Sequence, residues 1–281
     1  MEKVNKVYST EEVLGLMEPL VSKWFKERFT SLTEPQSMAI PVIHERKNVL
    51  ISSPTGSGKT LTAFTSILNQ LIKYSNEDTL EEKIYCVYIS PLKALANDVK
   101  RNLSDPLDQM RELAAREGMK VPEIRVAVRS GDTPQNERQK MVRHPPHILI
   151  TTPESMALIL ASPKFKEKLM GVEWLILDEI HDICDSKRGA FLSLTIEMLR
   201  NYCEHDFTRI GLSATVAPIE EVARYLVGFN PDGSDRDVIL IQSSSKKVLD
   251  LKVICPTEDM TALPTDVVSS MMYDRLKELV D

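Results

Sequence analysis

The chain has 281 residues, of which 42% are hydrophobic and 27% are charged, and its formal net charge is −6. This is the composition of an ordinary soluble protein, and the length accommodates one large domain with extensions. No apolar run reaches the roughly 18 residues of a membrane-spanning helix, and the amino terminus does not resemble a secretory signal. We therefore expect a cytoplasmic protein without a membrane partner. The negative charge excludes an overall positive field, so contact with nucleic acid must use a local basic strip and backbone amides.

The cysteines favour reduced thiols over metal ligands or disulfide bonds. None is spaced as Cys-x-x-Cys, and most fall in apolar surroundings: Cys86, Cys184, Cys203 and Cys255. A structural zinc site needs clustered thiol and imidazole ligands at short spacings. We therefore expect no zinc site.

The first 46 residues precede the first buried strand, and we expect them to form N-terminal helices. Thr33 and Gln36 fit a capping box, in which the first and fourth residues of a helix start bond each other's backbone N–H groups. The pattern predicts a helix that begins just after Thr33.

A phosphate-binding loop follows the apolar run Asn48 to Ile51. Its residues are Ser52-Ser53-Pro54-Thr55-Gly56-Ser57-Gly58-Lys59-Thr60. Small residues let such a loop wrap its N–H groups around phosphates, while the lysine reaches the β- and γ-phosphates and the threonine hydroxyl ligates Mg²⁺. Ser53 stands where the usual pattern has glycine, and it is small enough to permit the turn. Apolar residues at helical spacing follow, so the loop lies between a strand and a helix: Phe64, Ile67, Leu68, Leu71 and Ile72.

Strand-like and helical segments alternate along the rest of the chain. The predicted strands are 48–53, 84–90, 124–128, 147–151, 173–178, 208–213 and 237–241. A cap residue followed by proline predicts helix starts at Thr133, Thr152 and Ser162. This alternation predicts an α/β fold with a mostly parallel sheet and helices on both faces.

Two adjacent acids end one of these strands. The apolar run Trp174 to Leu177 is followed by Asp178, Glu179, Ile180 and His181. Ligands of open α/β sheets bind at the carboxyl ends of the strands. We therefore predict that Asp178 holds Mg²⁺ and that Glu179 positions and deprotonates a water molecule. The alternative, an acid pair that only caps a helix, is disfavoured by the phosphate loop.

The carboxyl-terminal part contains a predicted connecting strand, Leu249 to Cys255, and an amphipathic helix over 266–281. We divide the chain into N-terminal helices (1–46), a nucleotide-binding domain (47–245) and a linker strand and helix (246–281). The helix is expected to be covered by a further domain.

Further short motifs carry a resemblance to a known family. In chain order they are Phe29, Gln36, Ser90-Pro91-Leu92-Lys93-Ala94-Leu95, Ser130-Gly131-Asp132-Thr133, Thr151-Thr152-Pro153-Glu154-Ser155, the Asp-Glu-Ile-His box and Ser213-Ala214-Thr215. From about residue 15 to 255 the chain resembles the first RecA-like domain of a superfamily 2 helicase. The Asp-Glu-Ile-His box followed by Lys187-Arg188-Gly189 is most similar to the large-helicase-related (Lhr) family.

The resemblance implies a RecA-like, three-layer fold and an ATP- and Mg²⁺-dependent enzyme that moves on or unwinds DNA or RNA. It implies that ATP is bound by Phe29, Gln36, Ser53, Pro54, Thr55, Gly56, Ser57, Gly58, Lys59 and Thr60. Gln36 would read the adenine edge through its amide, with Phe29 packing nearby. The alternatives are a plain helix cap for Gln36 and a core position for Phe29. Catalysis would rest on Lys59, Asp178 and Glu179, with Thr60 and Asp178 as metal ligands.

The resemblance also implies a surface for single-stranded or tailed duplex nucleic acid. Its residues would be Pro91, Leu92, Lys93, Arg129, Gly131, Asp132, Thr133, Thr151, Thr152, Pro153 and Glu154. The segments Gly131 to Thr133 and Thr151 to Ser155 precede helix amino termini, whose N–H groups can donate hydrogen bonds to phosphate. The alternative is that each Thr-Pro pair is an ordinary helix start.

His181, Ser213 and Thr215 resemble residues that couple hydrolysis to strand movement, although a simple strand-end turn would also explain Ser213 and Thr215. Helicases of this class need a second RecA-like domain with arginines that reach the γ-phosphate. We expect that domain to be absent here, and the isolated monomeric chain to hydrolyse ATP very slowly. An ATP-driven DNA translocase subunit of a restriction or repair complex would share every motif. A GTPase or small-molecule kinase is disfavoured because no Asn-Lys-x-Asp signature follows a strand.

Overall fold

The computed structural model of the chain describes residues 1–4, 6–91, 93–243, 254–255 and 263–280, and for residues 93–102 and 280 it describes the backbone alone. The chain divides into two compact units, Met1–Ser245 and Lys246–Asp281. In the described residues, no helix has the length and apolar character needed to cross a membrane.

A fully parallel sheet forms the centre of the first unit. In the described residues it has eight strands, in the order β1-β8-β2-β7-β6-β3-β5-β4. Their bounds are β1 Glu2–Lys3, β2 Val49–Ser52, β3 Cys86–Ile89, β4 Val126–Arg129, β5 Ile148–Thr151, β6 Trp174–Leu177, β7 Thr208–Ser213 and β8 Ile239–Gln242. The prediction of a mostly parallel sheet is confirmed, and each of the seven strands predicted between residues 48 and 241 is present. Among the strands of the described residues, the two-residue β1, which pairs with β8, is the one that was not predicted.

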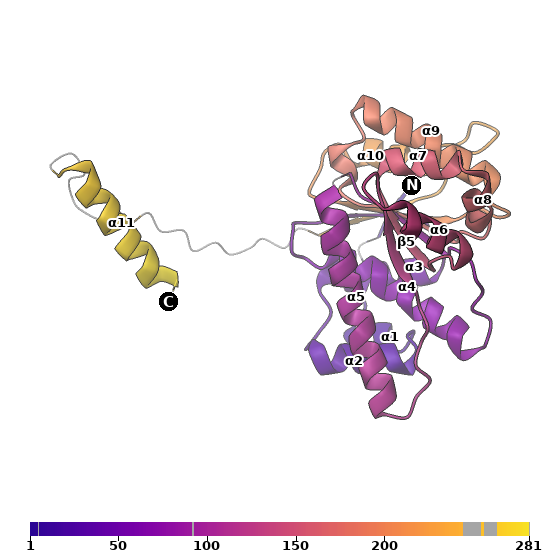
Figure 1. Cartoon of the computed structure of the whole chain (residues 1–281), viewed down its shortest axis with the longest axis horizontal. Helices are drawn as coiled ribbons and strands as arrows, with labels where there is room; N and C mark the ends of the chain where they lie inside the picture. The colour runs from indigo at the N-terminus through magenta and orange to yellow at the C-terminus, as the bar shows by residue number, and fades with distance from the viewer. Residues whose placement is uncertain (5, 92, 244–253, 256–262, 281) are drawn as a thin grey trace. The chain divides into compact units, whose positions relative to one another are not determined.

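Helices cover both faces of the sheet (Figure 1). One face is covered by α1 Thr10–Leu14, α2 Pro19–Arg28, α3 Glu34–His44, α4 Lys59–Asn76 and α5 Lys93–Arg116. The other is covered by α6 Gln135–Arg143, α7 Pro153–Leu160, α8 Pro163–Lys166, α9 Lys187–Tyr202 and α10 Ile219–Val227. Because successive strand residues point to opposite faces, neighbours such as Val87 and Tyr88 lie in different hydrophobic clusters. The predicted three-layer arrangement is therefore confirmed.

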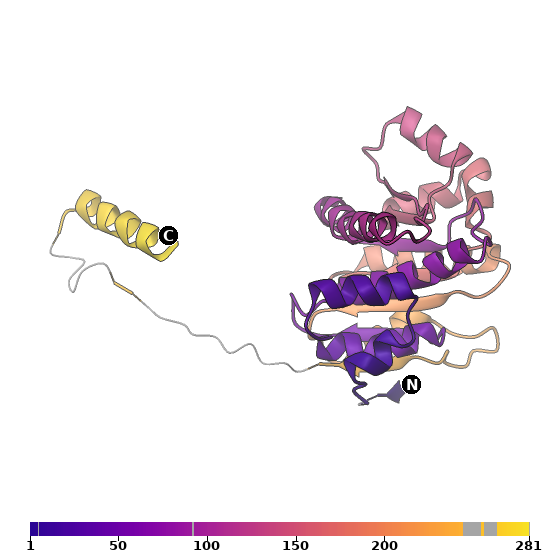
Figure 2. The ribbon, with the colours of Figure 1, turned by 90° about the horizontal axis from the view of Figure 1, so that it is seen from below.

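The N-terminal residues belong to the same packed unit as the sheet. Figure 2 views this unit from the side on which the N-terminal helices α1 and α2 lie, and these helices are drawn in indigo. Val13, Trp24 and Ile40 of α1, α2 and α3 are buried in the same hydrophobic cluster as α4. The helices of residues 1–46 therefore form part of one outer layer of the sandwich, whereas β1 joins the sheet.

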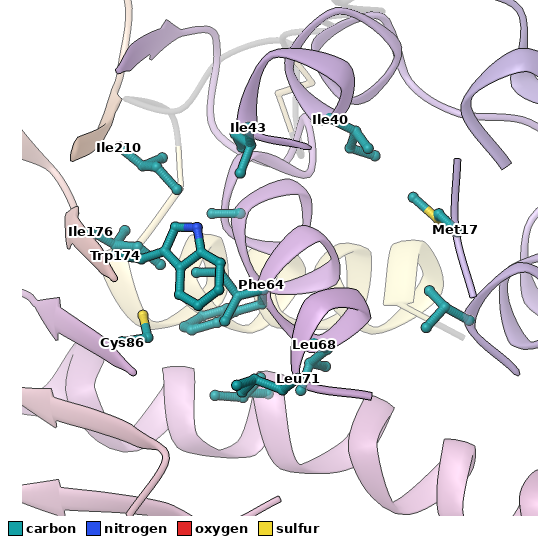
Figure 3. Packing of buried hydrophobic residues seen from close by; sticks show 14 of the residues in the cluster. Met17, Ile40, Ile43, Phe64, Leu68, Leu71, Cys86, Trp174, Ile176 and Ile210 are labelled. Atoms are coloured by element: carbon teal, nitrogen blue, oxygen red, sulfur yellow. The ribbon is translucent and has the colours of Figure 1, made fainter. Parts of the chain in front are cut away.

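Helix α4 anchors the phosphate loop to the sheet. Figure 3 shows its side chain Phe64 next to Trp174 of the sheet, and Leu68, Leu71 and Cys86 belong to the same buried cluster. All five are at most 2% exposed. Burial of each large apolar side chain contributes about 1.5 to 3 kcal/mol, so this contact fixes α4 against the strands.

Two of the three predicted helix caps are confirmed. Thr152 caps α7 and Ser162 caps α8, each with proline at the first helical position. The prediction for Thr133 is wrong by one residue. The carbonyl of Pro134 accepts the first helical bond, from Arg138 N, whereas the Thr133 hydroxyl accepts a bond from Ser130 N and closes the preceding turn.

The second unit contains one helix in its described part, α11 Thr265–Val280, which confirms the predicted helix over 266–281. The connecting strand predicted over Leu249 to Cys255 falls mainly on residues 249–253, which lie outside the described residues.

Candidate nucleotide site and nucleic-acid surface

Two glycines shape the turn between β2 and α4. Gly56 and Gly58 have φ angles of 79° and 87°, which is the left-handed region that side chains disfavour. Gly58 is the N-cap of α4, and a Cβ there would lie 3.0 Å from Nε2 of Gln36. The loop therefore needs glycine at position 58 for both conformation and space. It delivers the first N–H groups of an 18-residue helix to one point, which is a favourable place for an anion.

Lys59 begins α4 and is 6% exposed. Its Nζ donates to the loop carbonyls of Ser53 at 2.6 Å and Pro54 at 3.3 Å. Burial lowers the pKa of the ammonium, and the nearby carboxylates of Glu179 and Asp178 oppose that change. The cation predicted for the phosphates thus lies beside both predicted acids.

Gln36 contacts the loop from α3. Its Oε1 accepts a hydrogen bond from Thr33 N at 2.9 Å, and the Thr33 hydroxyl donates to Ser57 O at 2.9 Å. Gln36 is 5% exposed, with its amide nitrogen next to Gly58. The structure therefore shows the capping contact, and Oε1 keeps a second lone pair for a further donor.

The two possible roles of Gln36 can be separated by substitution. We expect Gln36→Ala to reduce the preference for ATP over GTP by about 1 to 3 kcal/mol, because a bidentate amide contact to adenine is lost. We expect Gln36→Glu to reduce it as well, while its carboxylate still accepts from Thr33 N and preserves stability. Competition binding with the two nucleotides measures the preference, and thermal unfolding measures the cap. A preference that survives in Gln36→Glu would leave Gln36 with the capping role alone.

Asp178 follows β6 at the same edge of the sheet and is 7% exposed. Its Oδ1 accepts from Glu179 N at 2.9 Å, and its Oδ2 accepts from the hydroxyl of Tyr88. Burial raises the pKa of this carboxyl, and the Tyr88 hydrogen bond acts against the rise. The Thr60 hydroxyl and the Asp178 carboxylate supply the oxygen ligands that Mg²⁺ prefers, so the donor set fits this ion.

Glu179 has a left-handed backbone conformation, with φ 45° and ψ 43°. Residues other than glycine adopt this conformation at a cost, and such strain is concentrated at functional sites. Burial, followed by the neighbouring Asp178 carboxylate, raises the pKa of Glu179, whereas Lys59 opposes the rise. A carboxylate with a raised pKa is a better base for a water molecule.

The turn from Asp178 to Ile183, the acidic turn, follows β6. His181 connects this turn to the end of β7. Its Nδ1 accepts from Ala214 N at 3.3 Å and lies 3.4 Å from Oε2 of Glu179. Because Nδ1 accepts, the ring proton of a neutral His181 is on Nε2, which lies 3.4 Å from Oδ1 of Asp182. Among the described residues, no three or more His, Cys, Asp or Glu side chains are grouped so as to hold a metal ion.

The end of β7 also contacts the phosphate loop. Ser53 N donates to Ser213 O at 3.2 Å, and the Ser52 hydroxyl donates to Ala214 O at 3.1 Å. The Ser213 hydroxyl is buried without a hydrogen-bond partner, and Thr215 is exposed. The segment Ser213 to Thr215 therefore lies between the phosphate loop and the acidic turn and touches both.

A pocket of about 630 Å³ opens beside the phosphate loop. Of the residues predicted for ATP, it is lined by Phe29, Thr55, Gly56, Gly58, Lys59 and Thr60, and Glu179 also lines it. Trp24 and Arg28 of α2 and Asp105 and Gln109 of α5 form a wall that sequence reasoning missed. Trp24 Nε1 donates to Gln109 Oε1 at 3.0 Å, so α2 and α5 are joined at this wall. A pairing between residues 85 positions apart leaves no local pattern in the sequence.

The predicted nucleic-acid residues divide into buried and exposed groups. Thr151 and Thr152 are at most 3% exposed, and their hydroxyls donate to Arg129 O and to the Ser155 hydroxyl. These threonines can contribute only backbone groups to a ligand. Leu92 and the side chain of Lys93 lie outside the described residues.

Arginine side chains organise the loops on this surface. The guanidinium of Arg129 lies over the Phe165 ring at 4.2 Å, and burial lowers its pKa. Arg138, which sequence reasoning missed, donates to Gly131 O and Thr133 O, each at 2.8 Å. It holds the turn Ser130 to Thr133 in shape, and Asp132 in that turn is exposed.

Arg188 joins two of the predicted segments. Its Nη2 donates to Pro91 O at 2.9 Å, and its Nε donates to Glu154 Oε1 at 2.5 Å. The next residue, Gly189, lies against the acidic turn: a Cβ there would come within 2.1 Å of Ile183 O. The pair Arg188-Gly189 therefore connects the predicted nucleic-acid surface to the turn that carries Glu179 and His181.

The parallel sheet, the phosphate loop and the acids at one edge define a nucleotide-binding domain of the RecA-like class. Residues 33–222 match the family model described as DEAD/DEAH box helicase. The chain belongs to this family, and it is the first RecA-like domain of a superfamily 2 helicase.

The relatives specify the branch of the family. The chain is 49% identical over all its residues to the ATP-dependent helicase Lhr-Core of Methanothermobacter thermautotrophicus, of which it covers 32%. It is 48% identical over 98% of its length to Lhr-Core protein 2 of Thermococcus barophilus, of which it again covers 32%. The structure of Mycobacterium smegmatis helicase Lhr bound to ssDNA and AMP-PNP superposes with a TM-score of 0.79 at 41% identity, over 95% of this chain and 33% of that one. The chain thus spans about a third of the length of these three relatives.

Proposed function

We propose that this chain is the ATP-binding and ATP-hydrolysing motor domain of a nucleic-acid-dependent helicase of the Lhr type. The observation that carries the proposal is that Lys59, at the start of α4, lines one pocket with Glu179, and that Asp178 precedes Glu179 at the end of β6. Lys59 and the two acids come from segments about 120 residues apart, and their meeting at one edge of the sheet is what phosphate and metal binding would require. The same proposal includes a cytoplasmic location and a monomeric state. It also includes the division of the chain into N-terminal helices (1–46), an ATP-binding domain (47–245) and a linker strand and helix (246–281).

Each group has a distinct task in phosphoryl transfer to water. The loop N–H groups and Lys59 bind the β- and γ-phosphates, and Lys59 leaves its loop carbonyls to do so. Thr60 and Asp178 would hold Mg²⁺, which would neutralise phosphate charge when bound. Glu179 orients a water molecule and takes its proton. Gln36 and Phe29 bind the adenine.

The predicted nucleic-acid surface and the coupling residues complete the proposal. Backbone groups at the starts of α6 and α7, with Arg129, would contact phosphates of a single strand with little sequence preference. His181 and the segment Ser213 to Thr215 would transmit the state of the nucleotide, which is supported by the bond from Ala214 N to His181. The Mycobacterium smegmatis relative was determined with ssDNA and AMP-PNP, which supports a single-stranded ligand and ATP for this chain.

An ATP-driven DNA translocase subunit that does not separate strands remains the second candidate, because it would use the same groups. A strand-separation assay on tailed duplexes distinguishes the two. Both candidates require ATP hydrolysis that depends on Glu179.

Substitution of Glu179 tests that requirement. We expect Glu179→Gln to keep ATP affinity within about threefold and to reduce the rate of phosphate release about 10²- to 10⁴-fold, because an amide cannot accept the proton. Single-turnover phosphate release, with enzyme in excess over ATP and with and without ssDNA or ssRNA, measures the rate even when it is slow. Glu204→Gln, at the opposite end of the strands, is the matched control. Equal rates for Glu179→Gln and the wild type would remove Glu179 from the reaction.

A further inference from the structure

Tyr88 is a buried polar residue next to the nucleotide site. It lies on β3, is fully buried, and stacks on Phe64 of α4 with ring centroids 5.1 Å apart and planes inclined at 23°. Its hydroxyl donates to Oδ2 of Asp178. A hydroxyl in the hydrophobic layer needs such a partner, because an unpaired one would be costly there.

The strand register explains how Tyr88 reaches Asp178. β3 and β6 are parallel neighbours, and Tyr88 is in register with Ile176, two residues before Asp178. Residues two apart on a strand point to the same face, so Asp178 points to the face on which Tyr88 packs against α4. The length of the phenol side chain spans the remaining distance along the strand direction to the sheet edge.

The contact fixes the orientation of the Asp178 carboxylate. Oδ2 is held by the Tyr88 hydroxyl, and Oδ1 is held by Glu179 N at 2.9 Å. With both oxygens held, the carboxylate plane cannot rotate. Each oxygen keeps another lone pair for a metal ion or a metal-bound water. The ring of Tyr88 is in turn fixed between Phe64 and the sheet.

We propose that Tyr88 is a positioning residue for Mg²⁺: it orients the Asp178 carboxylate and so raises the affinity of the nucleotide site for the metal. This inference rests on the proposed function, because it assumes that Asp178 serves Mg²⁺. Tyr88 acts through Asp178 and does not itself bind nucleotide or metal. Residues that hydrogen-bond metal ligands in this way change metal affinity about 10- to 100-fold when they are replaced.

The test measures how much Mg²⁺ strengthens ATP binding by the 281-residue chain. A fluorescent ATP analogue is titrated in Mg²⁺ and in EDTA, and the ratio of the two dissociation constants is the magnesium effect. We expect Tyr88→Phe to reduce this effect about tenfold or more and to leave binding in EDTA unchanged. Tyr85→Phe is the matched control: Tyr85 is also buried, but its hydroxyl accepts from Glu81 N. We expect it to behave as the wild type.

A double-mutant cycle separates positioning from a general loss of structure. Asp178→Asn should lose the magnesium effect, and adding Tyr88→Phe to it should change nothing further, because the two residues act through one contact. Equal magnesium effects in Tyr88→Phe and wild type would overturn the inference. A reduction by Tyr88→Phe that persists in the Asp178→Asn background would overturn it too, by showing that Tyr88 acts independently of Asp178. If the wild type itself shows no magnesium effect, the proposed function fails first.

Discussion

ATP binding by this chain should fall about 100-fold or more when Lys59 is replaced by alanine. Each hydrogen bond to a charged group contributes about 1.5 to 3 kcal/mol, and in the proposed function Lys59 bonds two phosphates. The substitution also leaves the carboxylates of Asp178 and Glu179 without their nearby cation, which increases their repulsion of the phosphates. Calorimetric titration with Mg-ATP measures the loss.

Lys73→Ala is the matched control, because Lys73 lies in the last turn of the same helix and is exposed. It should bind ATP as the wild type does. An unchanged dissociation constant for a folded Lys59→Ala chain would contradict the placement of the phosphates in this loop.

The second large effect concerns the free energy of unfolding. Gly189→Ala should destabilise the chain by about 3 kcal/mol or more, because the new Cβ would overlap the Ile183 carbonyl oxygen at 2.1 Å and the backbone must shift. Helix propensity alone predicts the opposite sign, since alanine favours a helix over glycine by about 1 kcal/mol. Urea unfolding therefore decides between crowding and propensity by the sign of the change.

Gly171→Ala is the control, because its new Cβ would also come too close to other atoms, but these belong to a side chain and not to the backbone. Its new Cβ would meet the Lys83 side chain, at 2.6 Å from Cδ, and that flexible, partly exposed chain can move aside. We expect a change within about 1 kcal/mol. A stabilised Gly189→Ala chain would show that α9 is free to move away from the acidic turn.

The sequence predicted the layers of the fold well because the signal is local. Each central strand is a short apolar run, and α4 shows its buried face by the spacing of Phe64, Leu68 and Leu71. The two-residue β1 carries no such pattern, because it is defined only by pairing with β8. Thr133 was predicted as a cap from its neighbour Pro134, but its hydroxyl bonds the preceding turn instead.

The site was predictable to the extent that its motifs are contiguous. The phosphate loop and the pair Asp178 and Glu179 are each one segment, and their meeting follows from parallel strands ending at one edge. The bonds from Tyr88 to Asp178 and from Arg188 to Glu154 join separate segments. They depend on strand register and on the exact packing of α9, which no local pattern records. The predicted roles of the site residues themselves stay predictions until the substitutions are measured.

The position of β7 has a consequence for how the chain folds. β7 lies between β2 and β6, and in the sheet Val49 pairs with Ile210, about 160 residues later. During synthesis β2 therefore emerges long before either of its neighbours β7 and β8, and until they arrive β2 and β6 both present unpaired edges. Such non-local pairing slows folding and exposes strand edges to wrong partners. A nascent chain that stops before residue 208 would hold the partial sheet β6-β3-β5-β4 and an unpaired β2, which makes β7 the strand whose arrival joins β2 to that sheet.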